Sequence, residues 1–509
     1  MPEQHALTVI AEVADSNVAP LRNLLHAVGQ NIDADGNVPL ASVQSLLPGG
    51  APAPGGPNFI EFRKLSTVHF LRWVLLEPAR DAQGNRIGAS LAFSTDYDGP
   101  LDAHLDELLR IAEPALQAIY SFCDPAPPSG QLLGFLCSRS RPYEAFYRGH
   151  PGRSVQQIWG SANHSEDELR DILEAEFDPP PRPASAVDAV ARARTATGHS
   201  GWRLAATAGP PLGVQWLALA KPFAVALTLF FFLPWILFGF WIGAASLAAA
   251  ILATAAALGV WGTLLNLLDR SDGCRECELL RQAGPPPDPD GSQDPYVAER
   301  RGARLREVSE MEDQQTFVQN QLTHVVNVKP GMLRLLWLRF VLCLIDWLAH
   351  TLFVKGKLGE IPTIHFARWV LIDDNRRLLF FSNYDFSWES YLGDFIDLAS
   401  DGLTGVWSNT TFFPPTRFHG WTALPRALWL ALRALPGLGS LRATLLFAQG
   451  AKRESDFKKW TRDHQVPTQV WYSAYPSLSV VNVNNNTEIA TGLFAPLTGA
   501  EQQVWLRRL

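Results

Sequence analysis

Histidine and arginine side chains recur in one motif that the chain carries twice. Residues 67–75 read TVHFLRWVL and residues 363–371 read TIHFARWVL, so only two positions differ. A histidine can serve as an acid, a base or a metal ligand, and an arginine beside it can pair with a carboxylate. The candidates for this chemistry are His69 and Arg72 in the first copy, and His365 and Arg368 in the second.

Both motifs are typical of β-strands, in which successive side chains point to opposite faces. Alternation predicts that His69 shares a face with Trp73 and that Arg72 lies on the other face, with the same arrangement around His365. Two interpretations remain open. The histidine is a haem ligand or acid–base group on the open face of a sheet, or it is a core residue and the arginine holds the fold together.

A tyrosine–aspartate pair follows each motif, where a strand is expected to turn into a helix. The two carboxylates are Asp98 and Asp385. An aspartate at this place can cap the helix by accepting backbone N–H bonds, and it can also serve as a distal acid–base group. We expect ion pairs of Asp98 with Arg72 and of Asp385 with Arg368.

Two further histidines, His150 and His464, lie in loop-like segments and are candidates for an exposed ligand. They precede two similar Trp-containing segments, 157–162 and 469–474. The CxxC of residues 274–277 lacks a second cysteine pair or histidines at zinc spacing. No metal site is predicted, and chance or acylation near a membrane explains this motif better.

The repeat predicts two copies of one α+β unit. Apolar runs, helical stretches and the two motifs suggest the order β-α-β-β-α-β, which is the ferredoxin-like arrangement. The last strand of each copy is expected at residues 118–123 and 404–409. The two copies can stand as separate units or join in one α+β barrel.

The segment 222–268 contains no charged residue and is long enough for two membrane-spanning helices. We expect a transmembrane hairpin of residues 223–241 and 244–265; one long span and a buried soluble hairpin are the alternatives. A hairpin puts both copies on one side of the bilayer. The basic flanks and five cysteines favour the cytoplasmic side.

Two segments of the second copy, 332–353 and 423–447, combine leucine and tryptophan with scattered arginine. Such a pattern is typical of a helix lying in the membrane interface, and two buried helices are the alternative. The expected division is a first copy at 1–178, a linker at 179–221, the hairpin at 222–268, a second linker at 269–320 and a second copy at 321–509. The net charge of −7, without long charged runs, argues against nucleic acid as a partner.

The duplicated β-α-β-β-α-β order, with its HFxRW and Tyr-Asp phrases, resembles the dimeric α+β barrel superfamily. Within it, the chain is weakly similar to the dye-decolourising peroxidases. That resemblance implies a haem cofactor, Asp98 as the distal acid and His365 or His464 as the proximal ligand. It does not extend to the full Gly-x-x-Asp-Gly pattern, because no glycine precedes Asp98 at that spacing.

Two functional hypotheses follow. The first is a membrane-anchored, peroxidase-like oxidoreductase that acts on apolar or lipid substrates and uses haem. The second is a non-catalytic lipid-binding or scaffold protein at the membrane, without a cofactor. Both name the lipid bilayer as a partner, and both leave a homo-oligomer open.

Overall fold

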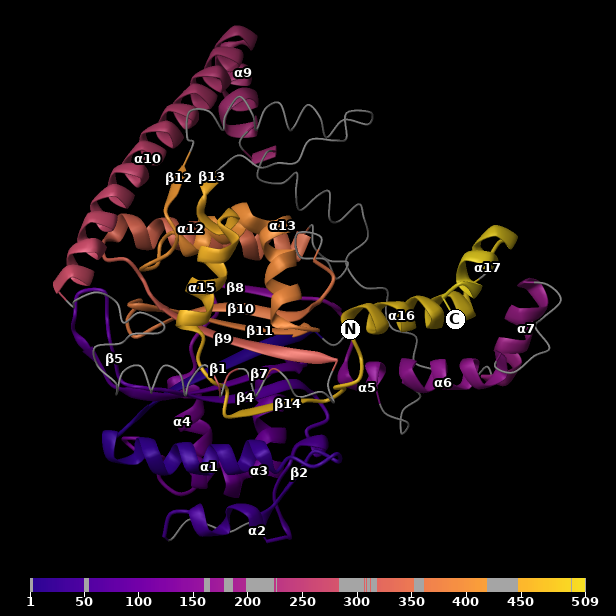
Figure 1. Ribbon diagram of the computed structural model, residues 1–509. Helices are drawn as coiled ribbons and strands as arrows, with labels where there is room; N and C mark the ends of the chain where they lie inside the picture. Colours follow the sequence, from indigo (N-terminus) through magenta and orange to yellow (C-terminus); the bar gives the residue numbers. More distant parts are fainter. Residues whose placement is uncertain are drawn as a thin grey trace.

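A computed structural model describes residues 3–508, apart from 50–54, 160–164, 178–185, 198–223, 226, 283–305, 307, 309–311, 313–317, 352–360, 419–446 and 496. Its centre is a pair of four-stranded antiparallel sheets that lie face to face (Figure 1). Helices cover the outer face of each sheet. The result is a helix–sheet–sheet–helix body, with further helices that extend beyond it.

Each sheet takes three strands from one repeat and its fourth from the other half of the chain. In the first sheet the order is β1 (Gln4–Val13), β7 (Ala89–Asp98), β4 (Val68–Leu76) and β14 (Val470–Ser473). In the second sheet the order is β8 (Ala145–Arg148), β10 (Ile364–Ile372), β11 (Arg377–Asp385) and β9 (Gln319–Asn327). The two edge strands β8 and β14 are therefore exchanged between the halves.

This exchange corrects the predicted unit. Residues 118–123 and 404–409 are not last strands, because they lie at and just beyond the ends of helices α3 (Leu101–Tyr120) and α13 (Trp388–Trp407). The apolar side chains of these residues suit a buried helix end as well as a strand, so the sequence pattern did not distinguish the two. The predicted boundary at residue 178 also divides one sheet from its own edge strand, since β8 pairs with β10.

Alternation along β4 and β10 gives each sheet two different faces. The outer faces pack on helices α1 (Val18–Gln30) and α3 in the first repeat, and on α12 (Met332–Thr351) and α13 in the second. The inner faces meet in an apolar layer drawn from both repeats. Its members are Ile10, Val74, Leu76, Ala92, Val370, Ile372, Leu379 and Phe381. Because both faces of each sheet are buried, the strands carry mostly apolar side chains on both faces.

Smaller elements complete the two halves. In the first repeat these are α2 (Leu40–Val43), α4 (Leu132–Arg139) and the ribbons β2 (Asn37–Pro39) with β3 (Asn58–Glu61), and β5 (Ala79–Arg80) with β6 (Arg86–Ile87). In the second they are α15 (Glu454–His464) and the ribbon β12 (Thr416–Phe418) with β13 (Phe447–Gln449).

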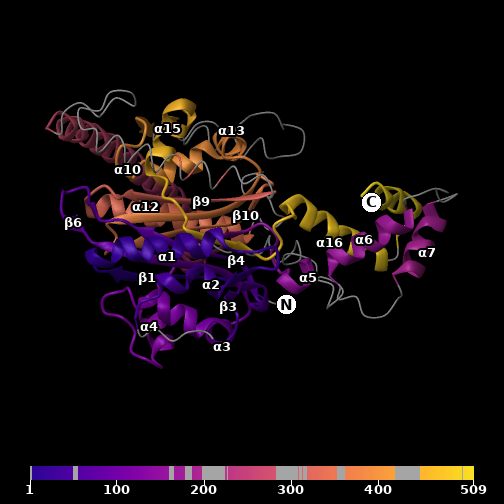
Figure 2. The same cartoon turned by 60° about the horizontal axis from the view of Figure 1, so that its bottom comes forward.

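A separate helical cluster stands beside the double sheet, as both views show (Figures 1 and 2). It combines α6 (Glu166–Phe177) and α7 (Ala186–Ala196) with α16 (Val480–Phe494) and α17 (Gly499–Leu506). Leu169, Leu173, Ile489 and Leu493 are among its buried side chains. The short helix α5 (Val155–Ile158) connects the body to this cluster.

A helical arm extends from the side of the body that carries the second repeat (Figure 1). It consists of a π-helical turn (Thr228–Phe232), α9 (Leu233–Phe238) and the 43-residue helix α10 (Phe240–Gln282). The chain reverses between α9 and α10 at Gly239, whose φ of +97° suits glycine.

The predicted transmembrane hairpin is wrong, and with it the predicted fold class. Among the helices that the structure describes, none is both long and apolar enough to cross a membrane. The apolar segment instead continues past residue 268 in one helix, α10, which ends at Gln282. An uncharged sequence can therefore belong to a longer helix whose last third carries charged residues.

Two charged residues of α12 have partners on neighbouring elements. Arg334 pairs with Asp269 and Asp272 of α10 at 2.5 and 2.8 Å. Asp346 accepts the backbone N–H of Phe146 at the edge of β8 (3.0 Å). These contacts explain how arginine and aspartate occur in an apolar helix. The interfacial position of α12 stays a prediction, and most of the second expected helix, 423–447, lies outside the described residues.

Candidate functional site

A β-bulge decides where the two motif histidines point. The pairing of β4 with β7 skips one residue between Val68 and Phe70, and the pairing of β10 with β11 skips one between Ile364 and Phe366. The extra, unpaired residue is His69 in β4 and His365 in β10. A bulge puts two neighbours opposite one partner residue and breaks the alternation of faces.

The prediction that the histidine and the tryptophan share a face is therefore wrong. Trp73 packs on the outer side against Phe62 and Phe93. His69 instead turns to the junction between the sheets, where its ring lies 5.1 Å from the ring of Phe366 in the other repeat. The bulge brings the histidine and the arginine of each motif toward the same inner side.

Each motif histidine pairs with the aspartate of its own repeat. His69 Nε2 lies 3.0 Å from Asp98 Oδ1, and His365 Nε2 lies 2.8 Å from Asp385 Oδ1. The expected ion pairs of these aspartates with Arg72 and Arg368 are wrong, because the arginines extend across to the opposite sheet.

Both aspartates also bind a helix start, but not of the helix that follows them. Asp98 Oδ2 accepts the N–H of Val155 in α5, and Asp385 Oδ2 accepts the N–H of Val480 in α16, each at 2.8 Å. The following helices α3 and α13 begin after Pro100 and Ser387 instead. The carboxylates thus fix distant segments, and their prediction as local caps is wrong.

The exchanged strands supply the centre of the site. His150 follows β8, and Tyr475 follows β14 at the equivalent position. The Tyr475 hydroxyl lies 2.7 Å from His69 Nδ1 and 3.2 Å from His150 Nε2. His150 Nε2 lies 3.3 Å from His365 Nδ1. We call the six side chains the central chain; its order is Asp98, His69, Tyr475, His150, His365, Asp385.

Hydrogen bonding assigns the protons of the central chain. With Nε2–H of His69 and His365 donated to the two aspartates, Nδ1 of each ring is an acceptor. Tyr475 then donates to His69, and His150 donates from Nε2. The remaining His150 Nδ1 lies 3.3 Å from the amide nitrogen of Gln4, which donates to it.

Two glutamines support the chain in equivalent ways. Gln4 Nε2 donates to Arg153 O at 2.7 Å, and Gln319 Nε2 donates to Leu478 O at 2.6 Å. Each carbonyl belongs to the segment that leads from an exchanged strand into α5 or α16. Gln4 is the first residue of β1 and Gln319 is the first residue of β9. The first strand of each repeat therefore fixes the segment that follows the exchanged strand, β8 or β14, in the same half of the chain.

The two motif arginines join the sheets deeper in the interface. Arg72 Nη1 donates to Leu322 O and Nη2 to Ser382 O, each at 2.9 Å. Arg368 Nη1 donates to Leu7 O and Thr95 O, each at 3.0 Å. These acceptors are equivalent in the two repeats, so each arginine is bound by the repeat to which it does not belong.

One acid accompanies the arginines. Asp96 Oδ1 lies 3.5 Å from Arg368 Nη2, and Asp96 Oδ2 accepts from Asn383 Nδ2 at 3.0 Å. Burial raises the pKa of Asp96, although the charge of Arg368 acts in the opposite direction. Burial lowers the pKa of Arg72 to about 9, which leaves it charged at neutral pH. The interface thus holds a compact buried charge cluster.

The central chain is sealed from solvent. His69, His150, His365 and Tyr475 have no exposed surface, and Asp98 and Asp385 are also buried. Desolvation, with the neighbouring His69, His365 and Arg153, holds the pKa of His150 well below its ordinary value. Burial raises the pKa of Tyr475 well above its ordinary value. These groups can pass protons among themselves but offer no open face to a substrate.

Sequence reasoning placed some of these residues and missed others. Asp98, His69, Asp385, His365 and His150 all belong to the central chain, while Arg72 and Arg368 lie near it. Tyr475, Gln4 and Gln319 were missed. A signal for Tyr475 exists, because YRGHPGRSV at 147–155 matches YSAYPSLSV at 472–480. The predicted match of 157–162 with 469–474 is therefore out of register.

The two loop histidines differ from their prediction. His150 is fully buried rather than exposed. His464 is the last residue of α15 and lies apart from the central chain; its Nδ1 bonds Trp460 O at 2.8 Å. Within the described residues no group of three or more His, Cys, Asp or Glu side chains is arranged to hold a metal ion, and the side chains of Cys274 and Cys277 lie outside that part.

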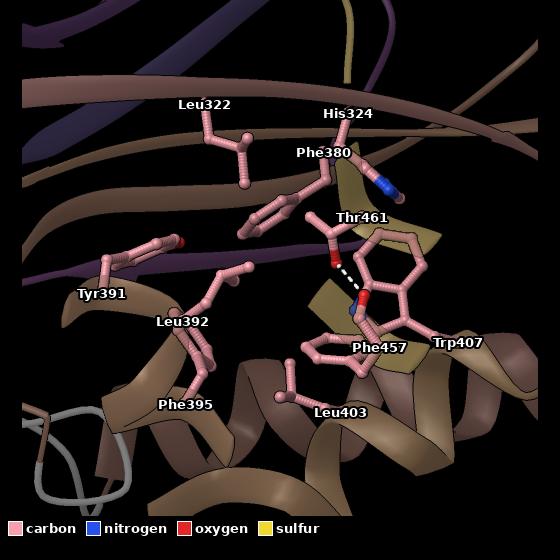
Figure 3. A pocket seen from close by; sticks show the side chains of 10 residues that line it. All are labelled: Leu322, His324, Phe380, Tyr391, Leu392, Phe395, Leu403, Trp407, Phe457 and Thr461. Carbon is pink, nitrogen blue, oxygen red and sulfur yellow. Dashed lines mark hydrogen bonds between the residues drawn. The ribbon is translucent and has the colours of Figure 1, made fainter. Parts of the chain in front are cut away.

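Haem does not fit the residues proposed to bind it. A haem ligand needs an imidazole nitrogen that faces a cavity of porphyrin size, and ligand cavities of that kind measure roughly 300–1,000 Å³. Both nitrogens of His69 and of His365 are engaged within the central chain. The cavity beside His324, whose ring lies 5.9 Å from the ring of His464, has a volume of about 20 Å³ (Figure 3). Haem binding stays a prediction without support from this geometry.

Comparison with known proteins found no matching family model, no matching curated protein and no matching solved structure. The resemblance to the dye-decolourising peroxidases therefore stays a prediction.

Proposed function

We propose that the chain is a lipid-surface protein whose helical arm binds the apolar phase, while the double sheet serves as a rigid body. The observation that carries this proposal is the uncovered apolar tip of the arm. Ile236 in α9 and Trp241 in α10 are 77% and 82% exposed, and Leu237, Phe238 and Phe240 between them are also exposed. Exposed apolar patches of this kind mark lipid or protein contacts.

The shape and composition of the tip favour lipid over a protein partner. The tip is the convex end of a projecting helical pair (Figure 1). A lipid phase accepts any apolar shape, whereas a protein partner needs a matching hollow. Tryptophan is enriched at the boundary between lipid and water because its ring is apolar and its N–H is polar. Trp235 and Trp241 supply this residue type at the tip.

The base of the arm is fixed to the body by charge. Asp269 and Asp272 of α10 bind the buried Arg334, and Asp269 also lies 3.6 Å from Lys329. From Phe240 to Asp269 the helix rises about 44 Å at about 1.5 Å per residue. The charged base and the apolar tip are thus at opposite ends of the arm.

A second exposed apolar surface lies on α12, which contacts the base of the arm. Met332, Leu336, Phe340 and Leu344 recur every fourth residue and are exposed, while Leu338 and Leu342 face the core. Residues four apart lie on one face of a helix. We call these four residues the α12 stripe. It supports an interfacial position for the second repeat.

The central chain supports a structural role for the body. Its groups are paired, buried and closed to substrate, which matches the non-catalytic hypothesis better than the oxidoreductase hypothesis. The oxidoreductase activity and the cytoplasmic orientation stay predictions.

Flotation of the purified full chain with phosphatidylcholine vesicles tests the proposal. The double substitution Ile236→Glu with Trp241→Glu changes two exposed side chains and leaves the core intact. Burial of each in lipid contributes about 1.5–3 kcal/mol, so vesicle binding falls by at least about tenfold. Leu133→Glu, an exposed position on α4 of the first repeat, is the matched control and floats like the wild type. Equal flotation of the double variant, or no flotation of the wild type, overturns the proposal.

A further inference from the structure

The end of the helical arm carries four aromatic rings in a row. Phe232 lies 6.0 Å from Trp235, measured between ring centroids. Trp235 lies 6.1 Å from Phe240, and Phe240 lies 5.5 Å from Trp241. All four side chains are exposed, from 38% at Phe232 to 82% at Trp241. We call these four residues the aromatic row; it bridges both limbs of the arm, because the chain turns at Gly239 between its second and third members.

The aromatic row makes the end of the arm wide. Helices α9 and α10 pack side by side there (Figure 1). Each is about 10 Å across with its side chains, so the end measures roughly 20 by 10 Å. Ile236, which is 77% exposed, adds a branched side chain to this end. A lipid surface therefore has to open a gap of this size between its headgroups before the arm can enter.

The arm carries no charge that could attract a lipid headgroup. Between Lys221 and Asp269 the sequence has no charged residue. Along α10 the charge nearest to the tip is Asp269, about 44 Å from Phe240 at about 1.5 Å per residue. The field of an exposed charge is screened over about 8 Å at physiological ionic strength. Burial of apolar surface, rather than attraction to charged headgroups, therefore has to supply the affinity of the tip.

Apolar exposure continues along the side of α10. Ile251, Leu252 and Val260 are 59%, 70% and 57% exposed. At about 100° per residue these three point in directions about 100° and 80° apart, so apolar side chains cover about half of the helix circumference. A helix that lies flat in a membrane interface has a strongly charged or polar face as well. The uncharged arm therefore suits entry from its end rather than a flat position.

Two hydroxyl groups of the arm are already hydrogen-bonded within it. Thr228 Oγ1 donates to Ala224 O, and Thr254 Oγ1 donates to Ala250 O, each at 2.8 Å. In a water-free phase every polar group has to be satisfied within the protein. These two threonines therefore do not oppose transfer of the arm out of water.

We propose that the arm recognises gaps between lipid headgroups rather than headgroup charge, so that its partner is a loosely packed, electrically neutral lipid surface. This inference rests on the proposed function, since it states which lipid surface the arm binds. A wide aromatic end gains apolar burial most readily where acyl chains are already accessible, because opening a closely packed surface consumes part of that gain. Without charge to hold the tip at the headgroups, lipid packing controls binding.

The test compares flotation of the purified full chain with small sonicated and large extruded vesicles of dioleoylphosphatidylcholine at equal lipid concentration. Strong curvature spreads the outer headgroups of the small vesicles, so we expect at least about tenfold tighter binding to them. Replacing part of the lipid by phosphatidylserine, or raising the NaCl concentration, changes the affinity by less than about twofold, because the tip is uncharged.

Variants at two exposed positions separate the width of the tip from its charge. Phe240→Leu with Trp241→Leu keeps the tip apolar but removes two rings, and the preference for small vesicles falls toward equal binding. Trp241→Lys introduces a positive charge, so its binding rises with phosphatidylserine and falls with NaCl. Leu133→Lys, at an exposed position on α4, is the matched control and retains the lipid preference of the wild type.

Failure of this inference is distinguishable from failure of the proposed function. Equal binding of the wild type to small and large vesicles, or binding that rises with phosphatidylserine, overturns the inference alone. Absence of flotation with every vesicle overturns both. An oligomer in sedimentation that Trp241→Lys converts to a monomer, without vesicle binding by the wild type, identifies a second copy as the partner of the tip and also overturns both.

Discussion

The two repeats are alike where they face each other and different where they face outward. Toward the interface, both have a bulged histidine paired with an aspartate, and an arginine that binds the opposite sheet. One likeness lies on the outer side, between sheet and helix, where Tyr97 stacks on His104 at 3.9 Å and Tyr384 stacks on Tyr391 at 3.8 Å. The shared interface holds both copies to one geometry.

On the outer side the repeats differ in surface chemistry. The exposed residues of α1 are Ala19, Pro20, Asn23 and Gln30, whereas the α12 stripe is apolar. The arm meets the body at α12, with no equivalent described beside α1. The comparison teaches that the same interface is compatible with outer helices of different surface chemistry, since α12 exposes large apolar side chains and α1 does not. The predictions below test how far the equivalence extends.

The largest expected effect is the loss of a crossing arginine. Arg368→Met removes the nearest positive charge from buried Asp96 and two hydrogen bonds to the carbonyls of Leu7 and Thr95, and we expect a cost of about 3–5 kcal/mol. Arg72→Met removes the equivalent bonds but lies farther from an acid, so its cost is smaller. Equilibrium unfolding in urea measures both. Adding Asp96→Asn to Arg368→Met recovers part of the loss, and identical costs for the two single variants contradict the role given to Asp96.

The next effect concerns the aspartates of the central chain. Asp98→Asn and Asp385→Asn each replace a carboxylate oxygen by an N–H₂ group, which cannot accept both the imidazole N–H and the helix N–H. Each costs about 1–3 kcal/mol, and the equivalence requires similar values. Asp102→Asn, an exposed acid on α3, is the control and changes stability little. If urea unfolding shows very different losses of unfolding free energy for Asp98→Asn and Asp385→Asn, the two aspartates are not equivalent.

A smaller effect depends on pH. His324 on β9 is buried, and desolvation holds its pKa in the folded state well below the value of about 6.5 in the unfolded chain. Because the unfolded chain binds the proton first, the wild type loses stability as pH falls below about 6.5. His324→Val removes this loss, so its stability relative to wild type rises by up to about 1.4 kcal/mol per pH unit between pH 6.5 and 5.

His104→Tyr is the companion variant, since Tyr391 occupies the equivalent position in the second repeat. Burial lowers the pKa of His104 to about 3, and its replacement should reduce acid sensitivity in the same direction. Urea unfolding at pH 7, 6 and 5 measures both variants. A stability difference from wild type that does not change with pH argues against a neutral buried ring at that site.

The smallest effect on stability is expected on the α12 stripe. Leu336 is about half exposed, so Leu336→Gln changes the free energy of unfolding by no more than about 0.5 kcal/mol. Leu338→Ala, on the buried side of the same helix, costs about 2–5 kcal/mol. A large loss from Leu336→Gln shows that the stripe is covered within the protein, which contradicts its assignment as a lipid-facing surface.

Local patterns in the chain located much of the machinery but not its pairings. The HFxRW motifs identified both strands and both histidines, and the Tyr-Asp pairs identified both carboxylates. The partners were wrong because a bulge shifts one residue at the start of each motif, and periodicity alone does not reveal an extra residue. His150 resembled a loop residue because Gly149 and Pro151 surround it, although the fold buries it completely.

The sequence by itself determined the duplication, because two nearly identical motifs and the segments around them require equivalent backbone geometry. It also determined that the segment before Asp269 exposes apolar side chains, since that segment has no charged residue to turn outward. Only the tertiary structure decided that β8 and β14 are exchanged, that His69 bonds Tyr475, and that the apolar segment after Gly239 continues into the polar end of α10. Strand exchange and hydrogen bonding join residues hundreds of positions apart, and such pairings depend on packing across the whole chain rather than on any local pattern.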